Sequence, residues 1–104
     1  MLVNKKKYED GATVTFKIVN GDEIVARLVR EDETGLLVSN PMAVIMAQKG
    51  LMLVPALFTV ETGQEIHVDF RHIMFHSVTN DQMSMHYVEQ TTGIKPVTRG
   101  SIIV

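Results

Sequence analysis

Apolar and polar side chains alternate along the first part of the chain. Every second residue is apolar from Val14 to Ile18, and the same holds from Ile24 to Leu28. A period of two is typical of a β-strand with one face on a core and the other in water. Asn20-Gly21 lies between the two runs, and this dipeptide favours a hairpin because both residues accept positive φ angles. The pattern therefore predicts an antiparallel hairpin.

The faces of these two strands limit the length of the turn between them. Placing Ile18 opposite Ile24 keeps both apolar sets on one face, and this requires a loop with an odd number of residues. We therefore expect a three-residue turn from Asn20 to Asp22, with Gly21 in the left-handed conformation. A polar turn at 31–35 then leads into a third apolar run.

The middle of the chain lacks clean alternation. The runs 42–48 and 51–60 are apolar on both faces, as expected of strands that are covered on both sides. Asn40-Pro41 predicts a break before the first run. Proline cannot donate to a ladder, so Pro41 and Pro55 are each expected at a sheet edge or a bulge. This hairpin predicts either ordinary core strands or a surface that another subunit covers.

Alternation returns between Glu65 and Val78. A polar break at 69–72 divides this stretch into two short predicted strands. Five apolar runs with hairpin turns, and no alternation of strands with helices, predict a mainly β fold. We expect a strongly bent, five-stranded antiparallel sheet that forms a small open barrel.

A helix is predicted after the last strand. Asn80 is a good N-cap, Asp81 suits the positive end of the helix dipole, and Gly93 is a natural stop. Alternating apolar residues leave a strand as the alternative: Met83, Met85 and Tyr87. The chain of 104 residues is thus expected to form one domain. Its predicted parts are a lead-in (1–11), the bent sheet (12–79), a helix (80–92) and a tail (95–104).

The first hairpin resembles the first sequence motif of the Sm-like (LSm) family. The motif has an apolar residue, Lys, Asn-Gly, an acidic residue, Leu, Asp and an apolar strand. The matching residues cover less than a third of the chain: Phe16, Lys17, Asn20, Gly21, Glu23, Leu28, Asp32 and 36–38. Two positions depart from the motif, because Thr34 and Gly35 replace the aromatic, His or Met and the Asn that contact a base.

Two later stretches carry fainter resemblances. Arg71 stands where the second Sm-like motif has the Arg of an Arg-Gly pair, but His72 replaces the Gly. Tyr87 followed by Thr-Thr-Gly-Ile at 91–94 resembles divergent Sm-like proteins of tailed phages that infect cyanobacteria. The family resemblance implies a homo-oligomeric ring of about five to seven subunits. It also implies single-stranded RNA as a partner and the cytoplasm, including that of a phage-infected bacterium, as the location.

The resemblance places candidate RNA-binding residues on two loops at the inner rim of the ring: Asp32, Thr34, Gly35, Phe70, Arg71 and His72. Asp32 would orient an Arg or accept from a base. Arg71 would pair with a phosphate or stack, and Phe70 or His72 would stack on a base. The alternatives are two ordinary turns and a ring that serves only as a protein scaffold, which the replacements at Thr34 and Gly35 favour.

Composition and charge narrow the chemistry. The net charge is −2 and the chain has no Cys, which excludes disulfides, thiolate metal sites and Cys nucleophiles. Without a basic balance, any nucleic-acid binding must be local. Neither a signal peptide nor an apolar run of about 18 residues is present, so we expect a soluble protein.

No pattern for enzymatic chemistry stands out. Four histidines invite a metal site and hence a small metal-dependent enzyme as a remote alternative: His67, His72, His76 and His86. Histidines on the solvent face of half-buried strands are the more ordinary interpretation. A nucleophile elbow and a phosphate-binding loop are both missing, so no catalytic residue, metal or cofactor is predicted.

Overall fold

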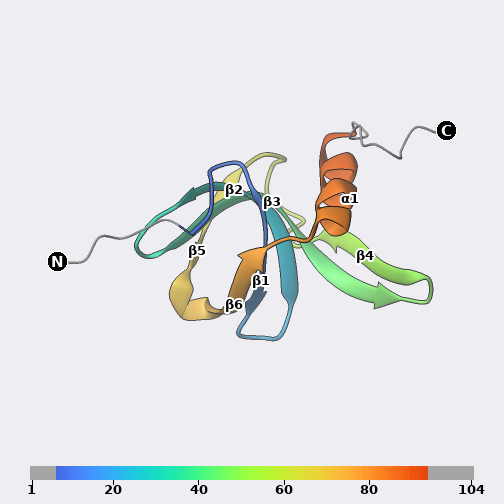
Figure 1. The fold of residues 1–104 in the computed structure, drawn as a ribbon, viewed down its shortest axis with the longest axis horizontal. Helices are drawn as coiled ribbons and strands as arrows, with labels where there is room; N and C mark the ends of the chain where they lie inside the picture. Colours follow the sequence, from blue (N-terminus) through green and yellow to red (C-terminus); the bar gives the residue numbers. More distant parts are fainter. Residues whose placement is uncertain (1–6, 94–104) are drawn as a thin grey trace.

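The computed structural model describes residues 7–93, which form an open, antiparallel β-sheet and one C-terminal helix (Figure 1). The elements follow the order β1 (Thr13–Ile18), β2 (Glu23–Glu31), β3 (Gly35–Ala47), β4 (Gly50–Pro55), β5 (Glu65–Asp69), the 3-10 turn η1 (Phe70–His72), β6 (Ile73–Val78) and α1 (Asp81–Thr92). The predicted fold class is confirmed, and the arrangement is consistent with an Sm-like fold. The predicted tail at 95–104 and most of the lead-in lie outside the described residues.

One long strand organises the sheet. The strand order is β4-β3-β2-β1-β6, and β5 also pairs with β3. The first part of β3 pairs with β5, from Gly35 to Ser39, and its second part pairs with β4, from Met42 to Ala47. β4 and β5 therefore form one edge that the loop 56–64 interrupts. The sheet therefore has six strands, where five were expected.

The register of the first hairpin differs from the expected one. Phe16, not Ile18, lies opposite Ile24. The Ile18 amide donates to the Asp22 carbonyl at 3.0 Å, so these residues close the turn. The turn therefore has three residues, from Val19 to Gly21, one position earlier than expected. Gly21 has a φ of 98°, as predicted.

The predicted break at Asn40-Pro41 is wrong, because β3 continues through it. The register between β2 and β3 shifts between Val25 and Arg27, opposite this point, and Asn40 has a φ of 50°. The irregularity is therefore a bulge inside one strand, as its proline requires. Here β3 changes its partner from β5 to β4. Pro55 ends the edge strand β4, also as expected.

Two apolar clusters pack on opposite faces of the sheet. The larger lies inside the open barrel and consists of buried aliphatic residues and one aromatic: Val14, Phe16, Ile24, Ala26, Leu28, Leu36 and Val38. The smaller joins β2, β3 and β4 to α1: Val25, Met42, Leu53 and Tyr87. The helix therefore stands on the outer face, at the base of the β3–β4 hairpin (Figure 1).

The caps of α1 match the sequence signals. The Asn80 side chain accepts from the Met83 amide at 2.8 Å, and Gly93 ends the helix with a φ of 76°. The helix runs from Asp81 to Thr92 and confirms the prediction. Among the described residues, no helix is long and apolar enough to cross a membrane.

The sheet leaves two edges open within the described part of the chain. β6 pairs only with β1, whereas β4 and β5 pair only with β3. Large apolar side chains are exposed beside both edges: Met74, Phe75 and Val78 on β6, and Leu51 and Met52 on β4. An unpaired edge with exposed apolar side chains is a template for pairing with another chain.

Candidate functional site

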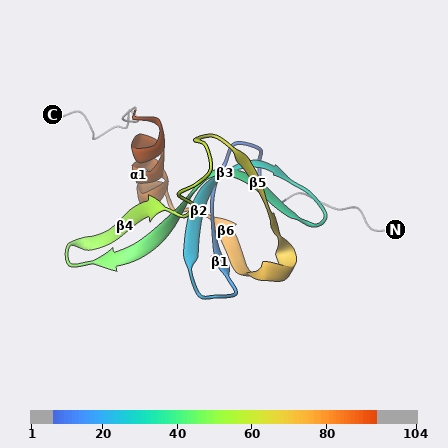
Figure 2. The ribbon, with the colours of Figure 1, turned by 180° about the vertical axis from the view of Figure 1, so that it is seen from behind.

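The two predicted loops lie side by side. The Phe70 amide donates to the Thr34 carbonyl at 2.8 Å, and Gly35 pairs with Asp69 at the ends of β3 and β5. Both loops lie toward one end of the molecule, away from the tip of the β3–β4 hairpin (Figure 2). The structure thus gathers the candidate residues from two distant parts of the sequence.

Gly35 allows this close approach. It is buried at the start of β3, and a Cβ atom there would overlap the Val68 carbonyl of β5. The need for a bare backbone explains why a glycine, and not a longer polar residue, stands at this position. Gly35 contributes its amide, which donates to Asp32 Oδ1 at 2.9 Å.

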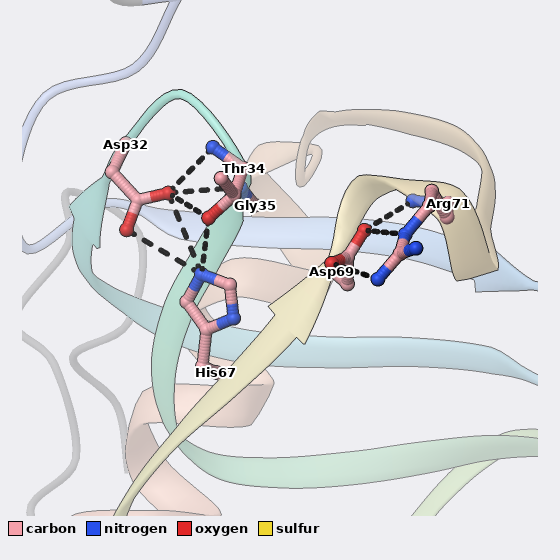
Figure 3. Close-up of polar contacts among 6 residues, drawn as sticks. All are labelled: Asp32, Thr34, Gly35, His67, Asp69 and Arg71. Atoms are coloured by element: carbon pink, nitrogen blue, oxygen red, sulfur yellow. Dashed lines mark hydrogen bonds and ion pairs between the residues drawn. The ribbon is translucent and has the colours of Figure 1, made fainter.

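Asp32 holds the β2–β3 turn together. Its Oδ1 atom also accepts from the Thr34 amide at 2.8 Å and from the Thr34 hydroxyl at 2.9 Å (Figure 3). The backbone hydrogen bond from Thr34, joined by the other donors, lowers the pKa of Asp32 to about 2. This carboxylate therefore stays charged, and most of its hydrogen-bonding capacity serves the loop.

Arg71 pairs with Asp69 and not with Asp32. Its Nε and Nη2 atoms donate to the two Asp69 oxygens, each at 3.1 Å, and its amide donates to Asp69 Oδ1 at 2.8 Å. These hydrogen bonds lower the pKa of Asp69 and raise that of Arg71. The Arg71 side chain is nevertheless 84% exposed, so its guanidinium is oriented and accessible.

Phe70 and His72 face different surroundings. Phe70 packs against the inner core and stacks on His76, with ring centroids 5.4 Å apart. Its ring is thus already engaged, whereas His72 is exposed. Of the two residues predicted to stack on a base, His72 is the one with a ring open to solvent.

His67 also lies at this site, although the sequence alone predicts only an ordinary surface histidine there. Its Nε2 atom lies 3.2 Å from the Thr34 hydroxyl and 3.4 Å from Asp32 (Figure 3). The signal that could have found it is the alternation of β5, which places His67 and Asp69 on one face. The pairing of β5 with β3, which brings His67 to Asp32, could not be read from that pattern.

The charge balance of the site is mixed. Arg71 is offset by Asp69, and the carboxylate of Asp32 in the neighbouring loop adds negative charge. Phosphate attraction at a single copy is therefore weak. Within residues 7–93, no group of three or more His, Asp or Glu side chains is placed to hold a metal ion.

Comparison with known proteins does not identify a family for this chain. No protein-family model matches the chain. No curated protein matches it either.

Proposed function

We propose that this chain is a subunit of an Sm-like, closed homo-oligomeric ring that binds single-stranded RNA weakly at its inner rim. The observation that carries the proposal is the joining of two loops distant in sequence, through the Phe70–Thr34 hydrogen bond and the Gly35–Asp69 pair. In Sm-like proteins the corresponding loops line the rim. The fold and the first sequence motif support the same family.

The open edges support ring formation. Pairing β6 of one copy with the β4–β5 edge of the next would satisfy both rows of unpaired backbone groups. Such a head-to-tail contact is heterologous, and it closes into a ring when the rotation between copies permits. It would also cover exposed apolar side chains of both edges, including Val78 and Leu51.

Repetition supplies the affinity for RNA in this proposal. Each copy offers the guanidinium of Arg71 and the ring of His72, and one stacking contact contributes only about 1–3 kcal/mol. Copies around a rim raise the effective concentration of each following contact. The acidity of the chain as a whole works against this binding. Because salt screens the Arg71–phosphate contacts repeated around the rim, binding is expected to fall steeply as salt is added.

A ring that acts only as a protein scaffold is the second candidate. The specific observation in its favour is that Asp32 and Arg71 both have partners within their own loops. Ring formation is common to both candidates, and RNA binding separates them.

The test compares RNA binding of the wild type and Arg71→Ala at low salt, by fluorescence anisotropy with a labelled single-stranded oligonucleotide. Lys49→Ala is the matched control, because it removes a positive charge at the β3–β4 hairpin turn, away from the rim. We expect Arg71→Ala to weaken binding strongly and Lys49→Ala to leave it nearly unchanged. A wild-type ring that binds no RNA, or an intact Arg71→Ala ring that binds normally, would favour the scaffold.

A further inference from the structure

His67 is held at the rim with one ring nitrogen turned inward and the other turned away. Nε2 faces the β2–β3 turn, where it approaches both Thr34 Oγ1 and Asp32 (Figure 3). Within the described part of the chain, Nδ1 of His67 has no hydrogen-bond partner. The side chain is 39% exposed, so a ligand at the rim can reach this atom.

The neighbouring hydrogen bonds decide which nitrogen carries the proton. The single hydroxyl proton of Thr34 is donated to Asp32 Oδ1. Thr34 Oγ1 and the carboxylate can then only accept from the imidazole. The network therefore assigns the proton of neutral His67 to Nε2, and Nδ1 presents a lone pair.

We propose that His67 is a further RNA-binding residue of the rim. Its Nδ1 atom accepts a hydrogen bond from an amino or hydroxyl group of RNA at neutral pH and donates one to a phosphate once the ring is protonated. The proposal rests on the proposed function and names a contact outside the loops that the family resemblance indicates. Asp32 and Thr34 act as positioning residues, since they orient the ring.

The charges around His67 support the proposed contact of its protonated ring with a phosphate. Neutral His67 leaves the Asp32–His67 pair with one negative charge, whereas protonation makes the pair neutral and removes a repulsion toward phosphate. The charged and titratable groups on the adjoining elements are Asp32 and Glu33 in the β2–β3 turn, Glu65 and Asp69 on β5, and Arg71 and His72 in η1. The register also places Arg30 of β2 on the same sheet face as His67, across Leu37 of β3. His72 is a second histidine of the site, so the test must separate the two histidines.

The experiment measures the Kd of the intact oligomer for labelled single-stranded oligoadenylate at low salt, at about pH 8 and about pH 5.5. It uses the wild type, His67→Ala, His67→Gln and His72→Gln, with His86→Ala on α1 as the matched control. Glutamine keeps one donor and one acceptor but does not titrate. Light scattering confirms that each variant keeps the wild-type assembly.

We expect His67→Ala to bind about threefold or more weakly at the higher pH, because a hydrogen bond is lost. His67→Gln should keep most of that binding but strengthen less than the wild type on acidification. His72→Gln should keep the part of the pH response that His67 supplies, and His86→Ala should match the wild type.

Two further ligands identify the contacted group. Oligodeoxyadenylate lacks the 2′-hydroxyl, and an RNA of purine riboside lacks the amino group. The penalty of His67→Ala should disappear with the ligand that lacks the contacted group. An equal penalty with all three ligands would contradict the acceptor role.

Two negative results have different meanings. Wild-type binding that Arg71→Ala reduces, while His67→Ala leaves both the affinity and its pH dependence unchanged, would overturn this inference alone. A wild-type oligomer that binds no RNA at either pH would overturn the proposed function, and the His67 contact with it.

Discussion

At the scale of single residues, the candidate site is built from short-range pairs that would compete with a ligand. Arg71 is the most exposed cation of the site, yet Asp69 occupies it through two side-chain hydrogen bonds. A carboxylate and a phosphate offer the guanidinium a similar pair of oxygens. In the proposed complex, RNA would compete with Asp69 for the Nε and Nη2 edge of Arg71, whereas the remaining N–H donors of the exposed guanidinium stay available.

Asp69→Asn should strengthen RNA binding at low salt by about threefold or more, because a charged hydrogen bond to Arg71 becomes a weaker neutral one. Asparagine can still accept from the Arg71 amide, so the η1 turn is expected to persist. Anisotropy titrations of the intact oligomer measure the effect. Glu65→Gln is the control, since it removes one negative charge from the same face of β5. Equal changes in the two variants would reduce the role of Asp69 to general electrostatics.

At the scale of elements, Tyr87 fastens α1 to the sheet. It is buried, and its hydroxyl donates to the Asn40 carbonyl at 2.7 Å, beside the bulge of β3. Gln90 adds a second link, because its Nε2 atom donates to the Leu53 carbonyl of β4 at 2.8 Å. The helix thus covers the outer face at the point where β3 changes partners, and it supports the base of the hairpin.

The buried hydroxyl of Tyr87 predicts a loss of folding stability at high pH. Burial raises the pKa of Tyr87 from 10.0 to about 12. The unfolded chain releases the Tyr87 proton first, so stability is complete below about pH 10 and falls as the pH rises toward about 12. The loss from Tyr87 is expected to approach about 1.4 kcal/mol per pH unit within that range.

Urea unfolding across this pH range measures the effect, and Tyr87→Phe should remove much of the pH dependence. That variant is also expected to lose about 1 kcal/mol at neutral pH, since the Asn40 carbonyl loses its donor. Tyr8→Phe measures the share of the pH dependence that Tyr8 supplies, because burial also raises the pKa of Tyr8. A pH dependence that survives in Tyr87→Phe would assign the loss to other groups.

Local signals predicted most of these elements. Alternation identified β1 and β2, and Asn80 and Gly93 set the ends of α1. The hairpin register was misjudged because the Ile18–Asp22 hydrogen bond closes the turn one residue early. The sequence does not reveal that β3 is continuous, because a proline within a bulged strand and a proline between two strands give the same local pattern.

The site was predictable only in part. The resemblance named two loops, and the structure brings them together. The approach of His67 to Asp32 depends on the pairing of β5 with β3, two strands distant in sequence. The contacts of Phe70 with His76 and of Arg71 with Asp69 are local, but they depend on side-chain placement around the η1 turn. Side-chain pairing of this kind leaves no period in the sequence. The reason for Gly35 likewise lies in β5, more than thirty positions away.

At the scale of the whole molecule, the proposed ring depends on the open edge of β6. Val78→Lys places a charge on this edge and should shift the oligomer toward smaller species, because an edge charge opposes strand pairing. Val19→Lys is the matched control, since Val19 is 60% exposed and Val78 is 59% exposed, but Val19 lies in the first turn. Size-exclusion chromatography compares the two. Dissociation by both variants, or by neither, would place the interface elsewhere.

Multi-angle light scattering of the wild-type protein at micromolar concentration tests the ring most directly. We expect one species with a mass of about five to seven times the 11.6 kDa chain mass. A closed ring would also keep this mass as the protein concentration is raised, because it leaves no edge free for further growth. A monomer at this concentration, or a mass that grows without limit, would contradict the ring.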